Sequence, residues 1–271
     1  MEYVSIGCCN LSSEARLSII MPAYYEGQAI VAVLDRIAES VLLPFECIVA
    51  IDQTEDPTVN IVEQYGKIDQ RFRVSINSLG RGPAYAIRHG FDQAKSRVAV
   101  VTMADGSDDP LDIDALVRLV ERGVVIAAAS RYMSGGQQVG AKGFKSLLSK
   151  LAGVSLYWFA RVGTHDATNS YKAYDIDFVK SVGIESQHGF ELGLELTAKA
   201  RRLRKQVAEI PTIWLERDQG ESNFQLKKWL PHYLAWYRFA YGKSSDMEEL
   251  RKDSKKLLRR KSRVFRDRKS K

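Results

Sequence analysis

Short apolar runs alternate along the chain with longer segments in which apolar residues recur every three or four positions. The short runs are typical of β-strands and the longer segments of amphipathic helices, so the first half of the chain predicts an α/β domain with a mostly parallel sheet. Runs such as "VAVVTM" and "VVIAAAS" are almost wholly apolar, which is typical of central strands with helices on both faces. We expect strands at Leu17–Met21, Glu46–Asp52, Arg73–Ile76, Val98–Met103 and Val124–Ala129, and helices at Gln28–Ser40, Pro57–Tyr65, Gly82–Ala94 and Pro110–Glu121.

The pattern changes after Tyr132, where a glycine-rich turn leads into a helical pattern over Phe144–Val162. No segment offers the roughly 20 uninterrupted apolar residues that a spanning helix needs, so we expect any membrane contact to be peripheral. Farther along the chain we expect a helix at Phe190–Ala200, strands at Val207–Ile210 and Ile213–Arg217, and an aromatic-rich helix at Gln225–Tyr241.

The positive charge of the chain is concentrated at its C-terminal end. The 271 residues have a net charge of +7, yet residues 243–271 hold 13 Lys/Arg and 5 Asp/Glu, which leaves a net charge of −1 for residues 1–242. Leu250, Leu257 and Val264 lie seven residues apart, as in a basic amphipathic helix that can bind an anionic membrane surface. A solvated, disordered tail is the alternative. Charge confined to one tail does not favour nucleic-acid binding.

These features divide the chain into an N-terminal extension (1–16), one main domain (17–242) and a basic amphipathic or disordered tail (243–271). The three cysteines, Cys8, Cys9 and Cys47, have the spacing of neither a metal site nor a secreted disulfide framework. The N-terminus lacks a signal-peptide pattern. We therefore expect a cytoplasmic protein.

Acidic residues follow the predicted strands, at the edge where parallel α/β sheets bind ligands. Asp105 lies too early to cap the next helix, and a carboxylate there suits Mg²⁺ or Mn²⁺ at a nucleotide diphosphate. Asp108 and Asp109 precede Pro110, so they also suit the start of that helix. Asp52 directly follows "IVAI" and suits either a base or ribose contact or a turn.

Arg131 directly follows a central strand, where its guanidinium suits a phosphate, with a salt-bridged surface arginine as the alternative. Other site classes lack their patterns. The glycines of "GRGPAYAIRHG" do not match a dinucleotide fingerprint, the four histidines lack metalloprotease spacing, and no Gly-x-Ser-x-Gly elbow follows a strand.

Seven segments in order give a more specific indication. They are "IIMPAYYE", "IVAIDQTEDPT", "NSLGRGPAYAIRHG", "MADGSDDP", "ASRYMSGG", "DATNSYKAY" and "ERDQGESNF". Over about residues 17–225 the chain resembles the family-2 glycosyltransferases of GT-A fold, in the dolichyl-phosphate mannosyltransferase or polyprenyl-phosphate glycosyltransferase branch. This resemblance implies a GT-A-type nucleotide-diphospho-sugar transferase fold.

The resemblance also implies roles for individual residues. For the donor nucleotide sugar it implies Pro22, Tyr24, Glu26, Asp52, Ala104, Asp105, Ser107, Arg131, Arg217 and Asn223; for an acceptor phosphate Arg131, Lys145 and Ser149; and for a divalent metal Asp105, Ser107 and Asp108. The chain departs from the family pattern at Met103, Gln53, Tyr25 and Asn223. Met103 replaces an expected metal aspartate, so either Asp108 compensates or Asp105 acts alone. The departures leave the donor open between GDP-mannose and UDP-sugars.

The function implied is inverting transfer of a hexose, of the mannose or glucose class, to polyprenyl or dolichyl phosphate at the cytosolic membrane face. Asp105 and Arg131 would act on the diphosphate, and Asp166 is a candidate base for a hydroxyl acceptor or, alternatively, a turn residue. Aromatic residues in Leu147–Phe159 and Trp229–Tyr241 suit a membrane interface, with core packing as the alternative. A glycan or other hydroxyl acceptor, or a catalytically degenerate nucleotide-sugar-binding module, are the competing functions.

Overall fold

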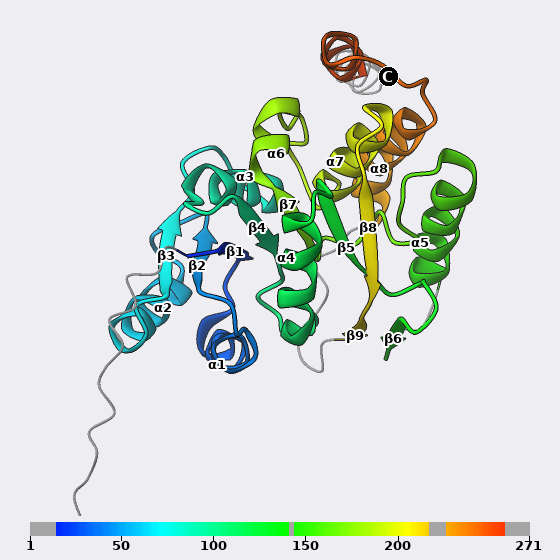
Figure 1. The fold of residues 1–271 in the computed structure, drawn as a ribbon. Coiled ribbons are helices and arrows are strands. Elements are labelled where there is room, and N and C mark those ends of the chain that lie inside the picture. Colours follow the sequence, from blue (N-terminus) through cyan, green and yellow to red (C-terminus); the bar gives the residue numbers. More distant parts are fainter. Residues whose placement is uncertain (1–14, 141–143, 217–225, 258–271) are drawn as a thin grey trace, which may run out of the picture.

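The computed structural model describes residues 15–140, 144–216 and 226–257. Helices lie on both faces of a central sheet with the strand order β3-β2-β1-β4-β7-β5-β8, in which only β7 is antiparallel to its neighbours (Figure 1). The strands of this sheet are β1 (Leu17–Ala23), β2 (Phe45–Ile51), β3 (Phe72–Ile76), β4 (Val98–Val101), β5 (Ile126–Ser130), β7 (Lys172–Asp175) and β8 (Val207–Pro211). A separate two-stranded sheet pairs β6 (Gln137–Val139) with β9 (Ile213–Leu215). The predicted α/β architecture is confirmed.

Most of the helices, with the exception of α6, match the segments predicted from the apolar periodicity. They are η1 (Gly27–Ala29), α1 (Ile30–Ser40), α2 (Pro57–Ile68), α3 (Pro83–Gln93), η2 (Pro110–Asp112), α4 (Ile113–Glu121), α5 (Phe144–Ser155) with its π-helical continuation η3 (Leu156–Ala160), α6 (Ile176–Val182), α7 (Leu192–Arg202) and α8 (Leu226–Ala240). Residues 247–257 form a further helix. None of the helices within the described ranges is long and apolar enough to cross a membrane.

Alternating side chains of the sheet divide the core into two clusters. Leu17, Ile19 and Met21 of β1 pack with α1, α2 and α4, whereas Ile20 packs on the other face with α3, η3, α6, α7 and α8. This alternation is what a strand with two buried faces requires. Gly90 lets α3 approach β1 closely, because a Cβ there would lie 2.3 Å from a methyl group of Ile20.

The sequence patterns did not predict β7 and α6. The strand "KAYD" begins with a lysine and ends with an aspartate, yet all four of its residues are buried between β4 and β5. Asp175 also caps α6 by accepting a hydrogen bond from the backbone N of Phe178 at 2.9 Å. A buried strand with charged ends carries no apolar run, so periodicity alone could not reveal it.

The described part of the C-terminal tail packs on the protein. Leu250 is fully buried in the second core cluster, and Met247 and Leu257 pack against it. Arg202 of α7 forms an ion pair with Asp253 at 2.8 Å. The expectation that this apolar helix face lies on a membrane is therefore corrected for residues 247–257, because their apolar side chains are used within the fold. Val264 lies outside the described residues.

Candidate active site

Polar residues from several strand ends meet at one edge of the sheet. Because β1, β2, β4 and β5 run parallel, the residues that follow them lie at the same edge, and antiparallel β7 brings its preceding loop there as well. The arrangement collects Asp52, Asp105, Arg131 and Asp166 on one side of the molecule. This is the edge at which open α/β sheets bind ligands.

Asp52 joins the end of β2 to the glycine-rich loop before α3. Its Oδ1 accepts a hydrogen bond from the Asn77 side chain at 2.8 Å, and its Oδ2 accepts one from the backbone N of Gly82 at 2.6 Å. Asn77 also donates to the carbonyl of Gly80 at 2.6 Å. Asp52 thus shapes the wall of the site, as the turn interpretation predicted. Single-residue patterns did not indicate a role for Asn77, although it opens the segment "NSLGRGPAYAIRHG".

The segment after β1 presents two aromatic rings to solvent. Pro22 is buried at the end of the strand, and the rings of Tyr24 and Tyr25 are more than half exposed and lie edge to face, 4.9 Å apart. Tyr25 adopts a left-handed φ of 54° and donates its backbone N–H to Asp56 at 2.7 Å. Asp56, which also caps α2, therefore holds this turn. Glu26 follows the turn and is half-buried.

Asp105 follows Val101, the buried last residue of β4, in the loop that leads to η2. It is half-buried, and its Oδ1 accepts a hydrogen bond from the backbone N of Ser107 at 3.0 Å. Ala104 and Ser107 are buried beside it. The carbonyl of Ser107 accepts the backbone N of Leu215 in β9 at 3.0 Å, so the small sheet braces the loop that presents Asp105.

Asp108 has a different role from the one expected. Its Oδ2 accepts hydrogen bonds from Thr102 Oγ1 at 3.1 Å and from the backbone N of Met103 at 3.0 Å. Burial raises the pKa of its carboxyl group to about 7. The structure does not favour Asp108 as a replacement for the missing metal ligand, because its carboxylate is buried against Thr102 and Met103, whereas Asp105 is only half-buried. Asp109 accepts the backbone N of Leu111 at 3.1 Å, as predicted for a helix cap.

Arg131 and the fully buried Asp166 form a two-point ion pair. Arg131 Nε donates to Asp166 Oδ2 at 2.6 Å and Nη2 donates to Oδ1 at 3.0 Å, and the backbone N of Arg131 also donates to Oδ2 at 3.2 Å. Burial alone would raise the pKa of Asp166, but Arg131, with Lys172, holds it below its usual range. Asp166 is therefore a poor proton acceptor, which corrects its interpretation as a general base.

The guanidinium of Arg131 is held in a fixed orientation. Its side chain lies over the ring of Tyr132 at 5.0 Å and over the ring of Trp214 at 5.9 Å. Within the described ranges, Nη1 has no hydrogen-bond partner. One edge of a fixed cation therefore remains available for an anionic oxygen.

Ser149 of α5 is connected to this ion pair. Its Oγ lies 2.9 Å from Thr168 Oγ1, and Thr168 donates to Asp166 Oδ1 at 3.4 Å. Helix α5 approaches the loop before β7 closely at Gly153, where a Cβ would lie 2.1 Å from the carbonyl of His165. The two predicted acceptor residues Arg131 and Ser149 thus belong to one hydrogen-bonded group.

Two polar residues near the ion pair, the buried Lys172 and the half-buried Glu209, were not predicted. Lys172 is fully buried and donates to the carbonyl groups of Ala167 and Asn169, and burial lowers its pKa to about 7. Glu209 of β8 accepts a hydrogen bond from the backbone N of His165 at 2.8 Å, and its second carboxylate oxygen is hydrogen-bonded to the Nδ1 of the His165 ring at 2.5 Å. Both hold the 164–171 loop in place. Only the quoted segment "DATNSYKAY" signalled Lys172.

A divalent metal fits this edge of the sheet if it is held by Asp105 together with the phosphates of a bound substrate. The described residues contain no group of three His, Cys, Asp or Glu side chains that would hold an ion by themselves. Asp105 supplies one carboxylate, and Mg²⁺ is commonly held by one or two carboxylates together with substrate phosphates. The side chains of Arg217, Asn223 and Lys145 lie outside the described residues.

Comparisons with known proteins show what the chain is similar to. The family model "Glycosyl transferase family 2" matches residues 18–181. A polyprenol monophosphomannose synthase from Mycolicibacterium smegmatis is 27% identical over 213 residues, covering 76% of this chain and 80% of that protein. An undecaprenyl-phosphate mannosyltransferase from Micrococcus luteus is 26% identical over 225 residues, covering 76% and 86%.

Among solved structures, glucosyl-3-phosphoglycerate synthase from Mycobacterium tuberculosis, in complex with Mn²⁺, uridine-diphosphate-glucose and phosphoglyceric acid, superposes with a TM-score of 0.63. The two chains are 16% identical, and the match covers 86% of this chain and 81% of the other. At this identity the likeness shows a common fold.

Proposed function

The chain belongs to glycosyl transferase family 2, and on this premise we propose that it transfers a hexose from a nucleotide-diphosphate sugar to a polyprenyl phosphate. It is a glycosyltransferase of GT-A fold. The names of the two relatives, both mannosyl-transferring enzymes with polyprenyl acceptors, support mannose as the sugar.

The Arg131–Asp166 pair is the observation that favours a phosphate over a hydroxyl group as the acceptor. A hydroxyl acceptor needs a general base, and the acidic side chain best placed for that role is ion-paired and has a lowered pKa. A phosphate monoester is already ionised, so its oxygen attacks without losing a proton to the protein. Arg131, held by Asp166, and Ser149 suit such a phosphate. Lys145 belongs to the same predicted group.

We assign the donor to the ends of β1, β2 and β4. Pro22, Tyr24, Glu26 and Asp52 would form the surroundings of the base and ribose, and the loop of Ala104 and Asp105 would face the diphosphate. The bracing of this loop by β9 supports the assignment, because a fixed carboxylate needs little reorganisation when charge develops. Arg217 and Asn223 are assigned to the donor phosphates from the sequence alone.

A divalent metal, Mg²⁺ or Mn²⁺, held by Asp105 and the donor phosphates would neutralise the charge that builds on the departing diphosphate. The protein's own contribution is to orient the two substrates. Asp105 fixes one end of the reacting pair, and Arg131 fixes the acceptor oxygen for a single displacement that inverts the anomeric carbon. Asp108 maintains the loop and has no contact with substrate in this scheme.

The polyprenyl chain needs an apolar surface near Ser149. Four large side chains of α5 and η3 are more than half exposed: Leu147, Leu151, Trp158 and Phe159. Exposed aromatic residues suit a membrane interface, so this face supports the peripheral membrane association that we propose. Trp236 is fully buried, as the core-packing alternative predicted for it. The basic residues after 257 remain candidates for contact with anionic lipid.

A matched pair of acceptors tests the proposal. The full chain is incubated with GDP-mannose or a UDP-sugar, Mg²⁺ or Mn²⁺, and either polyprenyl phosphate or the corresponding polyprenol. We expect a lipid-linked sugar with the phosphate only. Transfer to the alcohol or to a glycan would favour the hydroxyl-acceptor function. Nucleotide binding without any turnover, unchanged in Asp105→Ala, would favour a degenerate binding module.

A further inference from the structure

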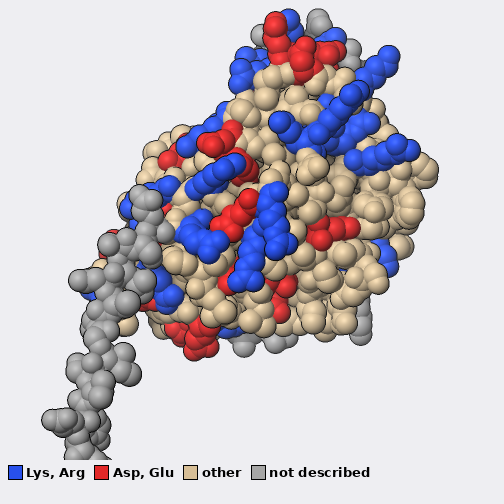
Figure 2. All heavy atoms as spheres, viewed as in Figure 1, with Lys and Arg blue, Asp and Glu red and all other residues tan. Residues whose placement is uncertain are grey.

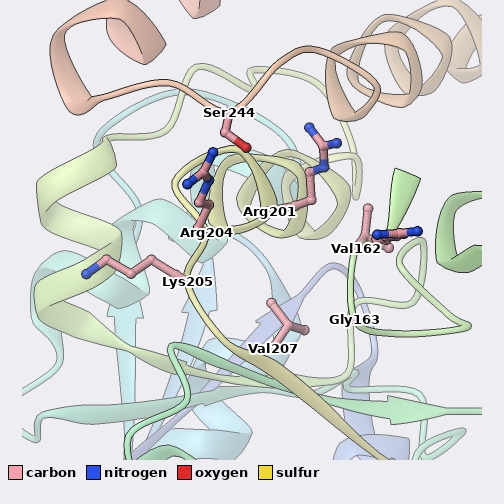
Figure 3. Close-up of a pocket in the computed structure, with 8 residues that line it drawn as sticks. Val162, Gly163, Arg201, Arg204, Lys205, Val207 and Ser244 are labelled. Carbon is pink, nitrogen blue, oxygen red and sulfur yellow. The ribbon is translucent and has the colours of Figure 1, made fainter. Parts of the chain in front are cut away.

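A basic pocket lies at the opposite edge of the sheet from the donor site. It has a volume of about 430 Å³ and is formed where the end of η3, the end of α7 and the start of β8 meet the segment after α8. Val207 is the first residue of β8 and pairs with Ile126, the first residue of β5. Arg131 of the proposed transferase site instead follows the last residue of β5, at the other end of the strand. Figure 3 shows Arg201 on α7 and Arg204 just after its end, with Ser244 above them and Val207 below. The pocket is therefore separate from the proposed transferase site.

The lining of the pocket is cationic and contains no acidic residue. Arg161, Arg201, Arg204 and Lys205 contribute, with Val162 and Val207 as the apolar part of the wall. Arg201 is held by the carbonyl groups of Ala160, at 2.7 Å, and Gly242. Within the described ranges, none of the four basic side chains forms an ion pair with a carboxylate. Unneutralised positive charge in a hollow attracts anions.

Two of these arginines occupy backbone positions that favour glycine. Arg161 follows η3 with a φ of 58°, and Arg204 follows α7 with a φ of 55°. Arg204 is the left-handed residue of a helix-ending motif in which its N–H bonds to the Arg201 carbonyl and that of Lys205 to the Ala200 carbonyl. Glycine is the usual residue at such a position. A non-glycine residue in a strained backbone conformation is more common at binding sites, where its side chain has a function.

The surroundings indicate where an anion would come from. Trp158 and Phe159, which are 66% and 77% exposed, immediately precede the Ala160–Arg161 end of η3. Figure 2 shows Lys and Arg side chains gathered over the region of α7 and α8. Exposed aromatic residues beside a group of cations are the two features that bind an anionic membrane surface.

We propose that this basic pocket is a binding site for a phosphate group, supplied by the headgroup of an anionic phospholipid. Arg161, Arg201 and Arg204 donate to the phosphate oxygens, and the exposed Trp158 and Phe159 enter the lipid interface beside it. The site thereby fixes which side of the protein faces the membrane. The inference does not depend on the sugar or acceptor proposed above.

The test uses substitutions that remove charge without adding strain. In the full chain, Arg161→Gly with Arg204→Gly replaces two left-handed arginines by the residue that favours this backbone. The matched control is Arg118→Gln with Arg122→Gln, which removes two exposed charges at α4 on the other face of the sheet. Ser244→Asp is a second test variant, because it adds a carboxylate on the wall opposite the arginines. Thermal unfolding verifies that all variants fold.

Binding is measured by co-sedimentation with vesicles of phosphatidylcholine alone or mixed with phosphatidylglycerol, and by calorimetry with inorganic phosphate. We expect the double glycine variant to bind anionic vesicles about thirtyfold more weakly than wild type, and Ser244→Asp to bind more weakly as well. The control should stay close to wild type. A pocket-dependent affinity for inorganic phosphate without any for vesicles would keep the phosphate site but reassign its source. Pocket variants that match the control in both assays would overturn the proposal.

Discussion

Asp105 and Asp108 are three residues apart, and the structure predicts that the same isosteric substitution affects them very differently. Asp105 is half-buried on a loop that faces the site. Asp108 is 6% exposed and accepts hydrogen bonds from Thr102 and Met103. We expect Asp105→Asn to lose most of the transferase activity and Asp108→Asn to retain it.

The size of each effect follows from these contacts. Removing a fixed group that stabilises developing charge costs about 10²–10³ in kcat, and Asp105→Asn should fall in this range. In Asp108→Asn the amide oxygen accepts the same two hydrogen bonds, so kcat should stay within about threefold, because the net value of an ordinary hydrogen bond is only about 1 kcal/mol. In Asp108→Ala both buried donors lose their acceptor, and the free energy of unfolding should fall by about 2–6 kcal/mol, at about 1–3 kcal/mol per unpaired group.

The assay measures kcat and KM for transfer from the preferred nucleotide sugar across a range of Mg²⁺ or Mn²⁺ concentrations, with urea unfolding of each variant alongside. Asp108→Asn should show the metal dependence of the wild type. If Asp108→Asn instead loses as much activity as Asp105→Asn, and added metal restores part of it, Asp108 is a metal ligand and the reasoning from its hydrogen bonds is refuted.

Three further predictions concern stability. Asp166→Asn leaves the Arg131 guanidinium buried without its counter-charge and should lower the free energy of unfolding by about 3–5 kcal/mol; urea unfolding as stable as wild type would contradict this. Because burial lowers the pKa of Lys172 to about 7, the unfolded chain binds more protons between about pH 7 and 10, so wild type should gain about 1.4 kcal/mol per pH unit relative to Lys172→Met over that interval. If the difference in unfolding free energy between wild type and Lys172→Met stays constant with pH in urea unfolding, a lowered pKa of Lys172 is excluded. Leu250→Ala should lower the free energy of unfolding by about 2–5 kcal/mol; urea unfolding at the wild-type midpoint would show that the packing of Leu250 contributes little.

The sequence predicted the buried strands that consist mainly of apolar residues. The strands "LSIIMPA" and "VAVV" are buried throughout and were found from their apolar residues. Strand β7 was missed because its burial comes from β4 and β5 on either side, while its own Lys172 and Asp175 resemble a loop. Tertiary packing decided its conformation, which a pattern of single residues does not record.

The strand-end residues were predicted as a group, but their partners were not. Asp105, Asp108 and Asp109 look alike in the sequence and each accepts a backbone N–H of its own loop, so only burial in the structure separates the half-buried Asp105 from the buried Asp108. The Arg131–Asp166 pair spans 35 positions. No local pattern reveals a pair that forms only when β5 and β7 lie side by side.

The position of β7 also determines the order in which the protein can be assembled. Strand β5 is synthesised before β7, yet its partners in the sheet are β7 and β8 and not β4. The β3-β2-β1-β4 half, with Pro22, Tyr24, Glu26 and Asp52, is complete in sequence by residue 101, whereas Arg131 must wait for a strand that ends at residue 175. We expect pulse-labelled hydrogen exchange during refolding to protect β1 and β2 before β5, and simultaneous protection would contradict this order. A growing chain would thus acquire a surface for the nucleotide well before it acquires the cation that receives the acceptor.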